Sequence, residues 1–195
     1  MKNTDNTNSK EVKIGNQVWM LENLDVEKFR NGDLIPQAKT AEEWENAGKN
    51  NEPAWCYYDN DESNGTKYGK LYNWYAVNDP RGLAPEGYHI PSNTELTELT
   101  DSLGHENVAG TKMKSTSGWY ESGNGNNSSG FSALPGGYRY INGSFSDLGK
   151  VGNWWSSSEG DTSNAISRFL NYYNADVFNY NSDKKNGFSV RCLKD

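Results

Sequence analysis

The sequence predicts an α+β fold, with two helices early in the chain and an antiparallel sheet late. Among its 195 residues are 20 Gly, 7 Trp, 12 Tyr and 6 Phe, a composition typical of short strands joined by many turns. Two helix-start patterns precede residue 100, and short strand candidates separated by turn residues follow residue 118. The length suits one domain, which we expect to span residues 12–195.

Two helices are predicted from capping boxes, in which the first and fourth residues bond each other's backbone N–H groups. The pattern Thr-x-x-Glu at 40–43 opens one helix, and Gly48 is a natural end for it. The pattern Ser-x-x-Glu at 92–95 opens the other, which Gly104 ends. This second helix carries leucines on one face, at positions Leu96, Leu99 and Leu103.

Strand candidates begin with a pair at residues 12–20, turned at Gly15-Asn16, and a buried strand at 54–58. Residues 70–77 have apolar spacing that fits one helical face. The late strands are predicted at 131–141, 154–158, 166–170, 176–180 and 188–193. In the third of these, alternation should send Phe169 inward and Arg168 and Leu170 the other way. The core candidates are Trp74, Leu96, Leu99, Trp154, Phe188 and Val190.

Charge and hydropathy exclude several classes of protein. The net charge is −7, and no basic cluster exceeds the pair Lys184-Lys185, so a nucleic-acid partner is not expected. No stretch approaches 18 consecutive apolar residues, so no membrane span is expected. Residues 1–11 are polar and lack the hydrophobic run of a signal peptide, which predicts a disordered lead or linker. Met1 is either native or the start left after removal of an export signal.

Catalytic and metal-site patterns are missing from the sequence. His89 lies among apolar neighbours, where we interpret it as a hydrogen-bonded structural residue, and His105 follows a helix end, where we expect solvent. The acidic segment 59–63 alternates oxygen ligands, but Asn64 and Lys70 break the calcium-loop pattern, which favours a solvated turn. We therefore predict no catalytic residue, no metal and no cofactor.

Two cysteines, Cys56 and Cys192, lie far apart in the chain and outside any Cys-x-x-Cys motif. A disulfide between them would close nearly the whole domain and stabilise it by about 4 to 5 kcal/mol in the chain-entropy model. The alternative is two buried thiols on core strands. The sequence leaves both open.

The last third of the chain is rich in Asn, Tyr, Ser and Asp. Tyrosine gives a large contact area for few torsions, and Asn and Ser form hydrogen bonds in several directions. This composition predicts a ligand-binding face, although an ordinary polar sheet face with Asn-containing turns would look the same. The candidate binding residues are Glu159, Asp161, Asn164, Asn171, Tyr173, Asn174, Asp176, Asn179, Tyr180 and Asn181.

Six segments together resemble the Fibrobacter succinogenes major paralogous domain family. They are residues 14–25, 68–77, 81–96, 129–139, 154–159 and 186–195. The resemblance implies a bacterial domain, often exported or lipid-anchored, with a C-type-lectin-like fold in the variant of formylglycine-generating enzymes. Two main helices would then pack on a twisted antiparallel sheet with long loops. The sugar-binding calcium motifs of C-type lectins and the late cysteine pair of the formylglycine-generating enzymes are both missing here.

The C-terminal layout is also similar to variable proteins of diversity-generating retroelements. In these proteins adenine mutagenesis converts Asn codons to codons for Tyr, Ser or Asp, and residues between Glu159 and Asn186 fit that set. We therefore expect an extracellular or cell-surface ligand-binding domain whose partner is a protein or a glycan. The alternatives are a structural or assembly domain, which would form homo-oligomers, and an oxidase of the formylglycine-generating type.

Overall fold

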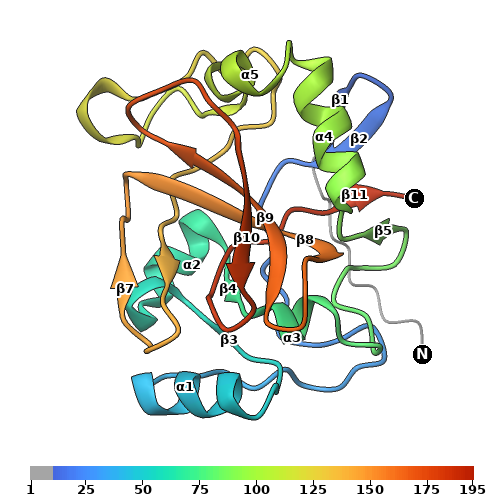
Figure 1. Ribbon diagram of the computed structural model, residues 1–195, viewed down its shortest axis with the longest axis vertical. Helices are drawn as coiled ribbons and strands as arrows, with labels where there is room; N and C mark the ends of the chain where they lie inside the picture. The colour runs from blue at the N-terminus through green and yellow to red at the C-terminus, as the bar shows by residue number, and fades with distance from the viewer. Residues whose placement is uncertain (1–10) are drawn as a thin grey trace.

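A three-stranded antiparallel sheet runs through the middle of the molecule, with helices on either side of it (Figure 1). The computed structural model describes residues 11–195. The strand order is β10–β9–β8, formed by Phe178–Asp183, Asn164–Asn171 and Val151–Glu159. Helix α4 (Asn93–Ser102) covers one face of this central sheet, and α3 (Trp74–Val77) contacts β8 from the other. The α+β class is confirmed.

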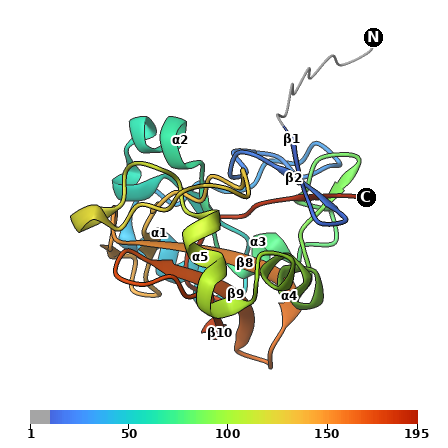
Figure 2. The ribbon, with the colours of Figure 1, turned by 90° about the horizontal axis from the view of Figure 1, so that it is seen from above.

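Strand β8 has buried side chains on both faces of the sheet. Successive side chains point to opposite faces, and each face is covered by an apolar cluster. Trp154 packs with Leu96 and Leu99 of α4, whereas Trp155 packs with Trp74 and Phe188. Figure 2 shows α4 and α5 (Glu106–Met113) lying over the strands. All six predicted core residues are buried. The sheet thus lies between two apolar clusters instead of packing on helices through one face.

The register of β9 confirms the predicted alternation but reverses its direction. Leu170 is fully buried and Arg168 is 5% exposed, whereas Phe169 is half-buried. The prediction that Phe169 points inward was therefore wrong. Helices α4 and α5 cover the face that carries Arg168, and this coverage is a tertiary property that the local pattern does not contain.

The two ends of the described chain meet in a four-stranded sheet of order β1–β2–β11–β5 (Figure 1). Strands β1 (Glu11–Ile14) and β2 (Gln17–Met20) confirm the predicted hairpin, whose turn uses Gly15 at φ 59°. Strand β11 (Leu193–Lys194) pairs with both β2 and β5 (Tyr88–His89). Glu11, which was predicted to belong to the lead, is the first residue of β1, and residues 1–10 of the predicted lead lie outside the described residues.

Both capping boxes are present. In α1 (Ala41–Lys49) the Thr40 hydroxyl accepts from the Glu43 N–H at 3.1 Å, and the Glu43 carboxylate accepts from the Thr40 N–H at 3.0 Å. Ser92 and Glu95 form the same box on α4. Each box satisfies backbone donors that a helix start leaves unpaired, which is why both starts could be predicted from local sequence.

Several elements differ from the prediction. Residues 70–77 form a strand and a short helix, β4 (Leu71–Tyr72) and α3, because Asn73 between them caps the helix through its side chain. Of the strand expected at 131–141, only residues 138–139 form a strand. The remaining elements are α2 (Glu62–Tyr68), β3 (Trp55–Cys56), β6 (Tyr138–Arg139), β7 (Phe145–Ser146), and the 3-10 turns Tyr58–Asn60 and Tyr120–Ser122. Within residues 11–195, no helix combines the length and apolar character that crossing a membrane requires.

Candidate functional site

The predicted binding residues lie along the β9–β10 hairpin but do not share one face. Tyr173 is 70% exposed, and Asn179, Tyr180 and Asn181 are exposed as well. Alternation along β10 sends Tyr180 to one face of the sheet and Asn179 and Asn181 to the other. The prediction of a single face was therefore wrong, and the hairpin offers two separate surfaces.

The surface on the Tyr180 side contains a groove of about 320 Å³, which we call the aromatic groove. Its apolar wall comes from β8, β9, the loop after β9, β6 and the segment before β11, and three polar side chains lie among these residues. The lining residues are Tyr138, Asp147, Lys150, Val151, Asn153, Phe169, Tyr172, Tyr173 and Phe188. A mainly apolar groove with a few polar groups is typical of a ligand site.

The rings around the aromatic groove contact one another edge to face, which is the favoured geometry for aromatic pairs. The ring centroids of Tyr172 and Tyr173 are 5.3 Å apart at 89°. Phe169 in the groove lies 5.7 Å from Tyr180, and Tyr180 stacks on Phe178 at 5.9 Å and 18°. The aromatic surface therefore continues from the groove onto the edge strand β10.

Tyr138 gives the groove a neutral hydroxyl. Its hydroxyl donates to that of Tyr140 at 2.7 Å. Burial, together with this neighbour, raises the pKa of Tyr138. The phenol therefore stays protonated at physiological pH.

The loop after β9 is held by contacts to its main chain. Asn171 is 1% exposed, and its side-chain oxygen accepts from the N–H groups of Tyr173 and Asn174 at 3.2 and 3.1 Å. Lys114 donates to the carbonyls of Asn171 and Asn174 at 3.1 and 2.9 Å. Asn171 was predicted to face a ligand, but it is buried because it shapes this loop. Asn174 and Asp176 in the loop are half-buried.

The turn between β8 and β9 uses four more of the predicted residues. Asp161 accepts from the N–H groups of Ser163 and Asn164 at 2.8 and 2.9 Å and from the Asn181 amide at 3.2 Å. Glu159 accepts from Lys184. These side chains stabilise the hairpin end, and Asp161 and Glu159 remain exposed.

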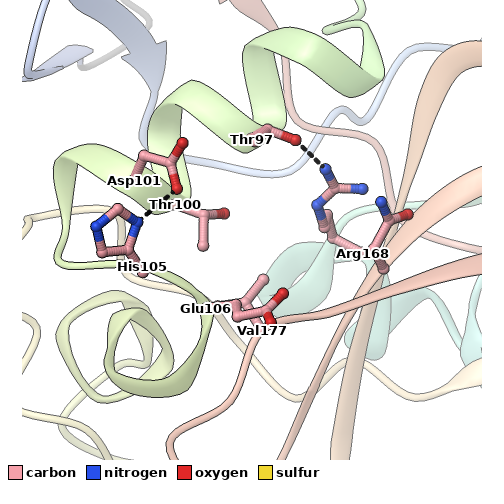
Figure 3. Close-up of a pocket in the computed structure, with 8 residues that line it drawn as sticks. Thr97, Thr100, Asp101, His105, Glu106, Arg168 and Val177 are labelled. Carbon is pink, nitrogen blue, oxygen red and sulfur yellow. Dashed lines mark hydrogen bonds and ion pairs between the residues drawn. The ribbon is translucent and has the colours of Figure 1, made fainter.

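The opposite face of the hairpin opens into a second cavity of about 300 Å³, the polar pocket (Figure 3). It lies between α4, the start of α5 and the strands β9 and β10. In Figure 3 the Arg168 guanidinium lies across the pocket from Asp101 and His105. The lining residues are Thr97, Thr100, Asp101, His105, Glu106, Arg168, Val177 and Asn179. Of the predicted binding residues, only Asn179 belongs to this pocket.

Cys56 and Cys192 are free thiols buried in different apolar clusters. The structure thus has the buried-thiol alternative and not the disulfide. Burial raises the pKa of each thiol to about 12. Because the thiolate is the reactive form, neither cysteine has the activated character of a catalytic nucleophile.

The histidines have carboxylate partners. His89 lies between Glu95 and Asp195, with ring nitrogens 2.9 and 2.8 Å from the two carboxylates. Burial alone would lower the pKa of His89, but these hydrogen bonds outweigh it and the pKa is raised. His105 is exposed and contacts Asp101 at 2.9 Å. No group of three potential metal ligands occurs among residues 11–195.

The family is established by comparison with known domains. Residues 12–194 match the Fibrobacter succinogenes major domain. The chain belongs to this family. No curated protein and no solved structure matches this chain.

Composition alone missed most of the aromatic groove. Tyr138, Val151 and Phe188 come from outside residues 159–186, where the candidate binding residues were predicted, and the fold brings them to this segment. The polar pocket was missed for the same reason, because Thr97 and Asp101 belong to α4. The exposed tyrosines of the segment were the part of the site that the sequence could reveal.

Proposed function

We propose that this chain is a non-enzymatic ligand-binding domain that binds a protein or a glycan on a cell surface through the aromatic groove and strand β10. The observation that carries the proposal is that Phe169, Tyr172 and Tyr173 line one groove, from which Phe169 contacts Tyr180 on β10. The C-type-lectin-like fold and the extracellular or cell-surface location implied by the family resemblance are part of this proposal.

The physical argument concerns what an exposed tyrosine contributes to binding. Tyr173 is 70% and Tyr180 49% exposed, so each has a large apolar area available for a partner. A buried aromatic anchor at the centre of an interface commonly contributes about 2 kcal/mol or more. The hydroxyls, together with Asp147, Lys150 and Asn153, would supply the polar contacts that determine specificity.

Diversification of this surface by a retroelement remains part of the proposal, in a narrower form. Asn171 and Asp161 hold the loop and the turn, so we expect them to be kept. Tyr173, Asn179 and Tyr180 are exposed and make few contacts that the fold needs. Deep sequencing of the 3′ segment in a natural population should show adenine-directed changes at these exposed codons, and a fixed segment would contradict diversification.

Binding can be tested with a glycan array and with surface-protein extracts, followed by titration of any hit. We expect Tyr173→Ala and Tyr180→Ala each to weaken binding about 30-fold, which corresponds to about 2 kcal/mol. Leu34→Ala is the matched control, because Leu34 is 68% exposed but lies outside the groove. A hit that binds both tyrosine variants as tightly as the parent would contradict the proposal.

Self-assembly is the second candidate function, favoured by the outer edge of β10, which pairs with no strand among residues 11–195. This strand reads Phe-Asn-Tyr-Asn-Ser-Asp and has no Pro or Lys, the residues that commonly protect sheet edges from pairing. Two copies could pair through β10, which would cover Tyr180. Light scattering over a concentration series would support this candidate if it showed a dimer that Asn179→Pro abolishes, and a monomer throughout would exclude it.

A further inference from the structure

Asn153 holds an unpaired amide inside the aromatic groove. The residue is only 6% exposed, and it belongs to the lining of the groove. Its side chain makes no hydrogen bond to any of residues 11–195. The amide oxygen and nitrogen are not among the fully enclosed unpaired atoms, so a ligand in the groove can reach both. A mostly buried amide with neither donor nor acceptor is unfavourable, which indicates that a ligand completes it.

Aromatic rings flank this amide on both sides, because β8 has a neighbour on each side. On one side, Asn153 pairs with Phe169 of β9, and paired residues point to the same face. On the other side, the Ser189 N–H donates to the Asn153 carbonyl at 3.1 Å, which brings Phe188 alongside. Phe188 in turn packs edge to face on Tyr138, with ring centroids 6.1 Å apart. The amide therefore faces a space bounded by apolar ring surfaces.

The charged side chains of the groove are one acid and one base, Asp147 and Lys150. Oδ2 of Asp147 accepts from the Ser146 hydroxyl at 2.9 Å, and Oδ1 has no hydrogen bond within the described residues. The Lys150 ammonium lies 5.3 Å from the centroid of the Tyr120 ring, a cation–π contact. The two charges sum to zero. The groove therefore favours an uncharged ligand, because an ionic ligand would lose its hydration without a net opposite charge to replace it.

An uncharged sugar ring meets these requirements together. Its edge carries hydroxyls that both donate and accept, and an Asn amide can bind two neighbouring hydroxyls through its oxygen and its nitrogen. Its faces carry C–H groups, which can pack against the negative faces of aromatic rings. An apolar protein side chain would instead leave the Asn153 amide unpaired once water was excluded. The groove volume of about 320 Å³ lies at the lower end of the range for small-molecule sites, in keeping with a single ring.

A second apolar platform continues from the groove along β10. Phe178 pairs with Phe169, and Tyr180, two residues further along, points to the same face of the sheet. The rings of Phe178 and Tyr180 are nearly parallel, at 18° with centroids 5.9 Å apart. Tyr180 is 49% exposed, so the next ring of a linear glycan can pack here.

We propose that the aromatic groove binds one uncharged sugar residue of a linear glycan, whose hydroxyls hydrogen-bond to Asn153 and Asp147. The next sugar residue packs on the platform formed by Phe178 and Tyr180. This inference rests on the proposed ligand-binding function and deepens it, because it selects a glycan over a protein and assigns the recognition of hydroxyls to Asn153.

The first test is isothermal titration of the full chain with methyl glycosides of glucose, galactose, mannose, xylose and N-acetylglucosamine, and with linear tetrasaccharides of the same sugars. We expect at least one of these sugars to bind. Its tetrasaccharide should bind at least about 10-fold more tightly than its methyl glycoside, because only the longer chain reaches β10. Tyr180→Ala should remove most of that gain. Failure of every sugar probe to bind would overturn the inference.

Asn153→Leu tests the amide itself, because leucine keeps the branched shape and removes both polar atoms. Binding of the sugar should weaken at least about 10-fold, and unchanged binding would overturn the inference. The midpoint of urea denaturation should stay the same or rise, since the fold loses no hydrogen bond, whereas an Asn with a purely structural role would lower it. Asn46→Leu is the matched control and should bind as the parent does, because Asn46 is exposed on α1 and lies outside the groove.

Asp147→Asn keeps the test decisive if Asn153→Leu does not fold. A carboxylate accepts stronger hydrogen bonds than an amide oxygen, so this variant should bind the sugar about 5-fold more weakly, and equal binding would overturn the inference. Failure of the inference can be told from failure of the proposed function. A protein that still binds the parent after periodate has destroyed its glycans, but does not bind Tyr173→Ala, would overturn the choice of a glycan and keep the groove as a binding site.

Discussion

Arg191 and Arg168 are both buried arginines, but they lie in regions of different character. Arg191 donates from Nε and Nη2 to the Asn23 side chain at 3.1 and 2.8 Å, and from Nη1 to the carbonyls of Phe131 and Met20 at 2.7 and 3.3 Å. Among residues 11–195, Arg168 finds acceptors for Nη2 alone. Every nitrogen of the Arg191 guanidinium thus has an acceptor. On β9, by contrast, two buried donors, Arg168 Nη1 and Asn171 Nδ2, have no acceptor among the described residues.

This difference separates a scaffold from the region through which we propose that the domain binds its ligand. Burial lowers the pKa of Arg191 to about 9, so the scaffold carries a charge that is costly to bury and compensates it with hydrogen bonds on all three nitrogens. The hairpin does not compensate Arg168 in this way, and it also exposes Tyr173 and Tyr180. The contrast can be tested by four measurements, from the largest expected effect to none.

Removing the two arginines should have unequal effects on stability. Arg191→Met removes the hydrogen bonds to the Phe131 and Met20 carbonyls and leaves Trp154 Nε1 as the remaining donor to the Asn23 oxygen. We therefore expect the free energy of unfolding to fall by about 3 kcal/mol or more. Arg168→Met should lower it by only about 1 kcal/mol, because its acceptor residues are half-buried (Asn93) and exposed (Thr97), so water can replace the lost donor. Urea denaturation measures both, and equal losses would show that Arg168 is as structural as Arg191.

Lys114 lies on the boundary between the two regions. Lys114→Met removes two charged hydrogen bonds to the loop after β9 and should lower the free energy of unfolding by about 2 kcal/mol. Amide hydrogen exchange should also become faster at residues 171–176. Lys112→Met, two residues earlier and inside α5, is the control, and a similar loss in this variant would remove the special role of Lys114.

A smaller effect, on pH dependence, is expected at His89 in the terminal sheet. Its pKa is raised in the folded state because hydrogen bonds to Asp195 and Glu95 outweigh burial, so the folded state favours the protonated ring. This stabilisation should be present below the ordinary pKa of about 6.5 and be lost as pH rises through the raised pKa. His89→Gln should remove that dependence.

The His89 contribution should stay below about 1 kcal/mol, because the ring is partly exposed and solvent screens the pair. Thermal unfolding of the parent and of His89→Gln should be compared at pH 5.5 and at pH 8. These values lie about 1 unit or more on either side of the ordinary pKa. A difference that grew with pH would contradict the assigned sign.

The cysteines should not react with an alkylating reagent in the native state. Both thiols have pKa values raised to about 12 by burial, so iodoacetamide should leave Cys56 and Cys192 unmodified until urea unfolds the chain. Mass spectrometry distinguishes the two states. Rapid native labelling of either thiol would revive the oxidase alternative.

Local signals made part of the fold predictable. The two capping boxes and the Gly15-Asn16 turn act within a few residues, so α1, α4 and the β1–β2 hairpin could be placed from sequence. Residues 70–77 are not one helix, because α3 begins only after Asn73. The Asn73 side chain also accepts from the N–H of Ala54 at 3.0 Å. That contact exists only after folding, so apolar spacing alone favoured the wrong structure.

The candidate site was predictable in composition but not in orientation. Asn171 and Asn179 look alike in the sequence, yet one shapes a buried turn and the other lines a pocket. Likewise, alternation placed Phe169 and Arg168 on opposite faces, but the choice of the covered face depends on α4 and α5. Side-chain type could therefore indicate a binding segment, whereas burial of each member required the tertiary structure.

The loop at 171–176 has a further consequence for protein engineering. The Gly110 N–H donates to the Ala175 carbonyl at 2.8 Å, and the Val177 N–H donates to the Glu106 carbonyl at 2.8 Å. Together with Lys114, these contacts hold the peptide backbone and not the side chains at 172, 173 and 175. A library randomised at those three positions should therefore present different side chains on one loop shape, which makes the domain a scaffold for selected binders.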